Sequence, residues 1–269
     1  MFLLAQPVNA FGWCSPERAV KSVINSQMKY ANKGNVDRFL KTYDSDYVDS
    51  DGFDLNTYSK LVKEIWSSYK NLKYSIKING IEIDGDKAVV SVTEYTNAQM
   101  EAVSKNYTGE LKSESDKISY LKKVNGKWKV YSDEIKDETT TMLYGEAKNL
   151  DVKLVVPLEI EPNTEYCTSL EFKAPKNMLA IASITSDKVE YPQKQSKEVF
   201  RAMPEDNILE RLFTSNMDDK NEYVVASIGL TQTDVSDLSI KMSLTGFGYV
   251  VRRVNVVPAK RKEITNEQS

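Results

Sequence analysis

The hydrophobic pattern of the chain changes its period near Asn71, and this change constrains the fold more than any other feature. Before it, apolar residues recur at helical spacing in three segments, at 15–34, 35–43 and 55–69. After it, apolar and polar residues alternate, as they do in strands that bury one face. Residues 15–147 are therefore predicted to form an α+β unit, three helices on a curved antiparallel sheet.

Local signals mark the ends of these elements. Ser15 is a suitable N-cap, Pro16 fits the first helical position, and Gly34 ends the same helix. Asp54 is expected to cap the third helix. Asn125-Gly126 is a strong signal for a two-residue hairpin, which would pair Leu121 with Val130 and Lys123 with Trp128.

Residues 150–258 contain no comparable helical pattern. Strand-like runs separated by turn signals occur at 151–160, 166–173, 178–186, 222–231, 238–244 and 249–257. This spacing predicts an all-β sandwich that is immunoglobulin-like in architecture only, because the Cys…Trp…Cys signature is absent. The connection near 144–149 is short, so the two units are expected to touch.

Four segments occur in order in the first unit: Asn32-Lys-Gly-Asn-Val-Asp-Arg-Phe-Leu, Tyr43-Asp-Ser-Asp-Tyr-Val-Asp, Gly85-Asp-Lys-Ala-Val-Val-Ser-Val and Asn125-Gly-Lys-Trp-Lys-Val-Tyr. This ordered set resembles the nuclear transport factor 2-like superfamily, which includes SnoaL-like proteins and ketosteroid isomerases. The resemblance covers about half the chain. It implies a cystatin-like α+β cone, in which helices close one face of a curved sheet around a pocket.

The chain has no histidine. Ser-His-Asp and Cys-His nucleophile systems are therefore excluded, and two cysteines with carboxylates make a poor zinc site. Among the activities of the superfamily that the chain resembles, scytalone-dehydratase-like chemistry depends on histidine and is excluded too. Ketosteroid isomerases place a Tyr and two carboxylic acids in the pocket, but no matching acid aligns here, so no catalytic residue is transferred. We expect no cofactor.

Strand parity predicts part of the pocket lining. Ala88, Val90 and Val92 share one face, which Glu94 continues inward. Beyond the hairpin, the same parity places Ser132 and Glu134 on the inner face. Glu94 and Glu134 are thus weak candidates for an acid–base pair. The alternative is that both lie at the solvent-exposed rim of the sheet, where the strands end.

Aromatic residues accumulate on the helical side. Those at helical spacing, Tyr58, Trp66 and Tyr69, form a stripe of a kind that is more often core than a cofactor site. The complete predicted ligand-binding set is Tyr30, Tyr43, Tyr47, Trp66, Tyr69, Glu94, Trp128 and Ser132.

The acidic segment Asp49-Ser50-Asp51-Gly52 does not fit a calcium loop. With Gly52 at the glycine position of an EF-hand, tyrosines would occupy both terminal ligand positions, Tyr47 and Tyr58. We therefore expect a hydrated turn that caps the following helix, and no metal site.

Charge is balanced, with 36 Lys+Arg against 39 Asp+Glu, and no basic stripe suggests nucleic acid. The one dense basic cluster, Arg252-Arg253 with Lys260-Arg261-Lys262, is interpreted as a solvated tail, and residues 259–269 as flexible. No apolar run is long enough to span a membrane.

The first 14 residues resemble the remnant of a secretory signal, since Val8-Asn9-Ala10 follows an apolar start. An extracytoplasmic location follows: periplasmic, secreted or on the cell surface. In such a compartment Cys14 and Cys167 would form a disulfide, and the alternative is two free thiols.

These observations favour an exported, non-enzymatic binding protein. Its cone would hold a small apolar ligand or pair with a second copy through its sheet, and its sandwich would contact a protein partner. The rival interpretation is a cofactor-free isomerase, dehydratase or hydrolase that uses the pocket carboxylates.

Overall fold

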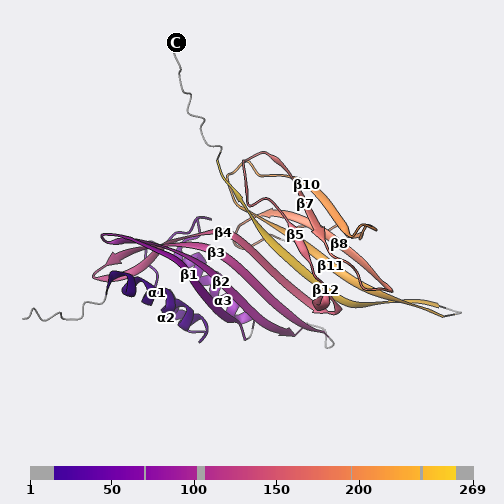
Figure 1. The fold of residues 1–269 in the computed structure, drawn as a ribbon, viewed down its shortest axis with the longest axis horizontal. Helices are drawn as coiled ribbons and strands as arrows, with labels where there is room; N and C mark the ends of the chain where they lie inside the picture. Colours follow the sequence, from indigo (N-terminus) through magenta and orange to yellow (C-terminus); the bar gives the residue numbers. More distant parts are fainter. Residues whose placement is uncertain (1–14, 70, 102–106, 195, 237–238, 259–269) are drawn as a thin grey trace, which may run out of the picture.

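One long sheet runs through both halves of the chain (Figure 1). The computed structural model describes residues 15–69, 71–101, 107–194, 196–236 and 239–258. Its elements are α1 (Pro16–Ala31), α2 (Val36–Leu40), α3 (Leu55–Ser68), β1 (Lys73–Asp84), β2 (Lys87–Glu101), β3 (Thr108–Val124), β4 (Lys127–Gly145), the 3-10 helix η1 (Glu146–Asn149), β5 (Lys153–Val155), β6 (Glu159–Ile160), β7 (Glu165–Glu171), β8 (Met178–Lys188), β9 (Arg201–Ala202), β10 (Ile208–Thr214), β11 (Glu222–Ser236) and β12 (Ser239–Val256).

The predicted N-caps of α1 and α3 are confirmed, whereas α1 ends at Ala31, before the predicted Gly34. The Ser15 side chain accepts a hydrogen bond from the backbone N–H of Arg18, and Asp54 accepts one from Thr57 at 2.7 Å. The second helix is shorter than the predicted 35–43. It ends early because Tyr43 leaves the helix to form a parallel bridge with Val130 on β4.

The long sheet has nine strands in the order β1-β2-β3-β4-β12-β11-β8-β9, with β6 paired to β12. The junction between the two halves is an ordinary antiparallel ladder, in which Thr140 faces Val251 and Met142 faces Tyr249. The expectation that the halves touch is confirmed. The contact is closer than a domain interface, because main-chain hydrogen bonds cross it.

A second sheet, with the order β10-β7-β5, covers one face of β8, β11 and β12. The core between the two layers contains Leu170, Ile184, Val224 and Val254, each at most 1% exposed. The layered β-structure predicted for 150–258 is therefore present, and its likeness to immunoglobulin domains stays a prediction. The sheet includes β10, which lies in a segment where no strand-like run is predicted.

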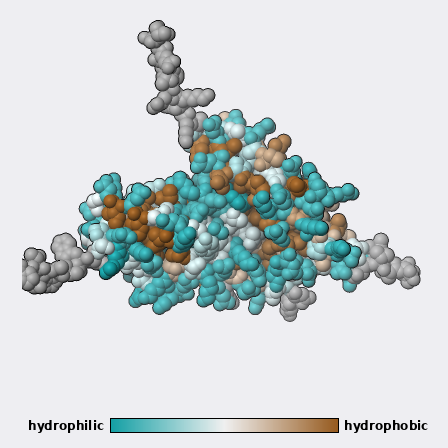
Figure 2. Space-filling model, viewed as in Figure 1, coloured by the Kyte–Doolittle hydropathy of each residue, from teal (hydrophilic) through white to brown (hydrophobic). Residues whose placement is uncertain are grey.

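The helices and the three-stranded sheet cover opposite faces of the long sheet at opposite ends (Figure 1). Cross-strand partners on β4 and β12 point to the same side, so Met142 and Tyr249 share the helical face, whereas Val250 points into the sandwich core. Figure 2 shows apolar side chains gathered toward both ends of the molecule with polar ones between them. Within the described residues, no helix is long and apolar enough to cross a membrane.

Two β-bulges in β4 decide which of its side chains face the helices. The hairpin pairs predicted across Asn125-Gly126 are confirmed, with Leu121 opposite Val130. Beyond it, Tyr120 faces Ser132, so Tyr131 is an extra residue and the alternation reverses. A second shift makes Lys136 an extra residue and reverses the alternation again.

The first bulge makes the predicted orientation of Ser132 and Glu134 wrong. Asp133 and Ile135 take the inward positions, and after the second bulge Glu138 does. Parity counted from the hairpin could not anticipate this result, because a bulge leaves no clear mark in a sequence of polar residues.

Candidate functional site

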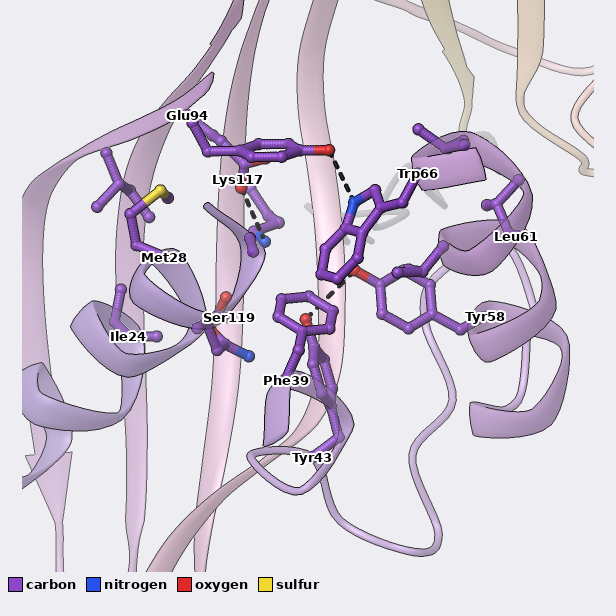
Figure 3. A pocket seen from close by; sticks show the side chains of 16 residues that line it. Ile24, Met28, Phe39, Tyr43, Tyr58, Leu61, Trp66, Glu94, Lys117 and Ser119 are labelled. Atoms are coloured by element: carbon purple, nitrogen blue, oxygen red, sulfur yellow. Dashed lines mark hydrogen bonds and ion pairs between the residues drawn. The ribbon is translucent and has the colours of Figure 1, made fainter. Parts of the chain in front are cut away.

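Two adjoining cavities lie between the helices and the inner face of the long sheet. The helix cavity, about 170 Å³, is lined by α1, α3 and neighbouring strand residues (Figure 3). The sheet cavity, about 450 Å³, extends over β3 and β4. The two share five lining residues, which are Tyr58, Ile65, Tyr74, Glu94 and Lys117.

A buried ammonium group lies between two carboxylates where the cavities meet. Lys117 on β3 is 3.6 Å from Glu94 on β2 and 3.9 Å from Asp133 on β4, and its side chain is 15% exposed. Burial alone would lower the pKa of Lys117, but the negative charges of Asp133 and Glu94 outweigh this effect and raise it. Lys117 is therefore cationic throughout the neutral range.

Asp133 is held in place by hydroxyl groups. The Tyr47 hydroxyl donates to its Oδ2 at 3.2 Å, and the Ser119 hydroxyl donates to its Oδ1 at 2.5 Å. Burial, followed by the charge of Asp133, raises the pKa of the Tyr47 hydroxyl, which stays protonated. The carboxylate is thus satisfied on both oxygens and is fixed as an acceptor.

Aromatic rings form the helical wall of the cavities. The hydroxyls of Tyr43 and Tyr58 are 3.3 Å apart, and the Trp66 ring N–H donates to the Tyr74 hydroxyl at 2.9 Å (Figure 3). Phe39 packs against Trp66 with ring centroids 5.4 Å apart. Burial raises the pKa of Tyr74 to about 12. These neutral hydroxyls and ring faces lie around the charged side chains of Glu94, Lys117 and Asp133.

The structure brings together five of the predicted site residues. Tyr43 and Trp66 line the helix cavity, Tyr47 and Tyr69 line the sheet cavity, and Glu94 lines both. Trp66 is also packed against the hydrophobic core, so it belongs both to the core and to the cavity lining.

The other predicted residues lie elsewhere. Tyr30 and Trp128 line a separate open groove beside α1. Ser132 is among the lining residues of neither cavity. Glu134 points to the opposite face of the sheet, where it accepts a hydrogen bond from Tyr120 at 3.0 Å and pairs with Lys136. The hypothesised pair of Glu94 and Glu134 does not form, because the bulge at Tyr131 turns Glu134 outward.

Sequence reasoning missed Lys117, Asp133 and Glu138. A signal for Lys117 existed, since counting back by twos from the inward Leu121 gives Ser119, Lys117, Ser115 and Ser113. Such a small and polar inner face is typical of strands that line a cavity. Asp133 and Glu138 carried no such signal, because the bulges determine their orientation.

Asp51 makes a buried ion pair with the last strand. The Arg253 guanidinium binds both of its carboxylate oxygens, at 2.6 and 3.0 Å, with 0% of the arginine side chain exposed. Asn221 also donates to Asp51 at 2.7 Å. The sequence interpretations were wrong at these two residues, because the Asp51 carboxylate is buried within an otherwise partly exposed turn and Arg253 does not belong to a solvated tail.

The second half of the chain also supports Glu138. The Tyr223 hydroxyl on β11 donates to the Glu138 carboxylate at 3.0 Å. Burial raises the pKa of Glu138, although Tyr223 and Arg253 oppose the effect. The sheet cavity is thus bounded by groups that both halves hold in position.

Asp49, which lines the sheet cavity, provides a test of how pH changes the stability of the protein. Burial raises its pKa to about 6, assisted by Asp51 and Asp133 and opposed by the backbone N–H groups of Phe53 and Asp51. Because the folded pKa exceeds the unfolded value, the stability that Asp49 confers is complete below about pH 4 and is lost as pH rises through 6. After solvent screening we expect a loss of about 1–2 kcal/mol between pH 4 and 7.

Asp49→Asn should remove that loss while keeping the acceptor for both backbone groups. Urea unfolding of both proteins at pH 4, 5, 6 and 7 measures the difference. Asp46→Asn, on an exposed neighbour in the same loop, is the control. Identical pH profiles for wild type and Asp49→Asn would refute the assignment.

Within the described residues, no group of three or more His, Cys, Asp or Glu side chains is placed to hold a metal ion. Cys167 lies exposed on β7. Cys14 lies outside the described residues, as do the predicted leader at 1–14 and the tail at 259–269, so the disulfide stays a prediction.

Among protein families, the model described as the anti-sigma-I factor RsgI9 C-terminal domain matches residues 22–141, which lie within the predicted first unit. No curated protein matches the chain.

Several solved structures are similar to part of the chain. Bd1075 from Bdellovibrio bacteriovorus has 14% identity over 43% of this chain and a TM-score of 0.37, and the chain spans only 38% of that protein. A protein described as a dehydratase of the NTF2-like family from Streptomyces avermitilis has 10% identity over 45% of this chain and 95% of its own, with a TM-score of 0.37. Kfla4162 from Kribbella flavida has 10% identity over 44% of this chain and 88% of its own, with a TM-score of 0.38.

Proposed function

We propose that the chain is a binding protein, in which the paired cavities hold a small organic ligand and the β-rich half contacts a protein partner. The observation that carries this proposal is the Glu94–Lys117–Asp133 arrangement at the meeting point of two open cavities. Withdrawing three charges from bulk water is costly. Charged groups placed in this way are therefore more common at binding or catalytic sites than in ordinary cores.

The same arrangement argues for binding over acid–base catalysis. An acid–base pair of carboxylates needs its two carboxyl groups to face each other. Here the Lys117 ammonium lies between Glu94 and Asp133, so each carboxylate is paired with Lys117 and not with the other. Such a centre can hold polar ligand groups, but it is poorly suited to deliver a proton to a substrate.

The family match supports an interaction role, because the matched domain comes from a protein described as an anti-sigma factor. We propose that ligand occupancy of the cone is communicated to a protein partner. An extracytoplasmic location belongs to the same proposal, and so does a homodimer through the outer face of the cone sheet. The apolar start of the chain supports the location, and the exposed sheet face supports the dimer.

Ser115→Trp tests the cavity as a ligand site. Ser115 lies on β3 and lines the sheet cavity, so an indole ring there fills part of that cavity. Native mass spectrometry of protein purified from its own cell extract should detect a bound small molecule on wild type and at least tenfold less on the variant. Ser132→Ala, on the opposite face, is the control and should retain the ligand.

Circular dichroism establishes that both variants are folded. Equal ligand retention by wild type and Ser115→Trp would contradict the proposal, as would the absence of any ligand together with no thermal shift across a small-molecule panel. Conversion of the ligand by wild type but not by Glu94→Gln would instead support the rival enzymatic interpretation.

A further inference from the structure

A second hollow lies on the same face of the long sheet as the sheet cavity. This hollow, about 290 Å³, lies over β8, β11 and β12 beside the crossing segment, defined as residues 189–194 and 196–200. Its lining includes Asp187, Lys194, Glu198, Tyr223, Tyr249 and Val251.

The two hollows adjoin each other by direct strand pairing. Thr140 and Met142 line the sheet cavity, and their partners Val251 and Tyr249 line the second hollow. Directly opposed side chains have Cβ atoms about 5 Å apart, so the linings of the two hollows border each other across β4 and β12. We call the two neighbouring hollows together the trough. It extends over four strand steps, from β3 to β8, which is about 19 Å at the usual strand spacing.

The sides of the trough come from both halves of the chain. The Tyr191 hydroxyl of the crossing segment donates to the Glu64 carboxylate of α3 at 3.0 Å. The helix and the crossing segment are thereby joined over the face that the trough occupies. A ligand that fills it contacts both halves at once.

The lining of the trough is acidic. Its seven carboxylates are Asp49, Asp51, Glu94, Asp133, Glu138, Asp187 and Glu198, against the two ammonium groups of Lys117 and Lys194. Arg253, behind Asp51, compensates one more charge. The elevated pKa values of Asp49 and Glu138, raised first by burial and also by neighbouring carboxylates, agree with a surplus of negative charge.

Aromatic faces accompany the carboxylates. Tyr58, Tyr69 and Tyr74 lie at the end beneath the helices, and Tyr249, 38% exposed, lies at the middle of the trough. Carboxylates together with aromatic faces favour organic cations, through Coulomb attraction and cation–π contacts. Anionic ligands would be repelled by the same lining.

We propose that this trough binds a linear aliphatic polyamine, with one ammonium group among the carboxylates of the sheet cavity and another beside Asp187 and Glu198. The proposal rests on the proposed function and names its ligand class. Glu138 on β4 and Asp187 on β8 are three strand steps apart, about 14 Å, so the ligand is an extended triamine or tetraamine. A basic peptide fits less well, because the floor is a sheet face that offers it no free strand edge.

Calorimetric titration with spermine, spermidine and 1,4-diaminobutane tests the inference. Affinity should rise at least tenfold from the diamine to spermine and fall steeply with added salt. Glu198→Gln should weaken spermine binding by about tenfold and leave diamine binding unchanged, whereas Glu138→Gln should weaken both. Glu134→Gln, on the opposite face, is the matched control and should change neither.

The failures of the two proposals are distinguishable. If Ser115→Trp abolishes retention of a cellular ligand but wild type binds no polyamine, the ligand class is wrong and the binding function remains. If a lysine-rich peptide binds more tightly than spermine and loses affinity in the same variants, the polyamine assignment is overturned in favour of a peptide. Equal spermine affinity in wild type and Glu138→Gln also overturns the proposal.

Discussion

Arg253→Met should lower the free energy of unfolding by about 3–5 kcal/mol, the usual cost of breaking a buried ion pair from one side. The Arg253 side chain is 0% exposed and binds both oxygens of Asp51. Its removal leaves a partly buried carboxylate with Asn221 as its remaining side-chain donor. Urea unfolding at pH 7 measures the loss.

The neighbouring residue supplies the control for this prediction. Arg252 pairs with Asp137 at 2.9 Å near the surface, so Arg252→Met should cost about 1 kcal/mol or less. The double variant Asp51→Asn with Arg253→Met should be more stable than Arg253→Met alone, because it removes the orphaned charge. Equal costs for the two arginine variants would mean that the buried pair does not hold the junction together.

Lys117→Met should cost about 3 kcal/mol at pH 7, because it leaves Glu94 and Asp133 close together without their shared counter-ion. Without the ammonium group, the two carboxylates face each other as uncompensated negative charges. Adding Glu94→Gln to the Lys117→Met variant should therefore recover part of the loss, because it removes one of these charges. Urea unfolding at pH 7 of both variants and of wild type measures the recovery.

Lys112→Met is the matched control for this second prediction, since Lys112 lies on the same strand with its side chain 67% exposed. It should leave stability within about 0.5 kcal/mol of wild type. No recovery of stability by Glu94→Gln in the Lys117→Met background would show that lost packing, and not the uncompensated charges, causes the destabilisation.

The sequence predicts the order of elements well, because local physics determines it. The caps at Ser15 and Asp54 and the hairpin at Asn125-Gly126 depend on residues within a few positions of each other. The pairing of β4 with β12 was not predicted. Nothing near Met142 identifies Tyr249 as its partner, because register between distant strands is set by the packing of the whole sheet.

The candidate site was predicted in part for the same reason. Glu94 and Tyr43 lie on regular elements whose faces follow from periodicity, and they reach the cavities. Glu134 was misplaced because one additional residue in the strand inverted the parity on which the prediction depended. Asp51 and Arg253 were both interpreted as solvated, since each residue finds its partner only in the folded chain.

The ladder between β4 and β12 also sets the order of events during synthesis. Met142 and Tyr249 pair across 107 positions, the difference between 249 and 142. On the ribosome, β4 therefore waits about 5–20 s for its partner at ordinary rates of elongation. During that time its open edge is available to other nascent chains, so this protein depends on timely completion of its last strand more than a two-domain protein with a simple linker would.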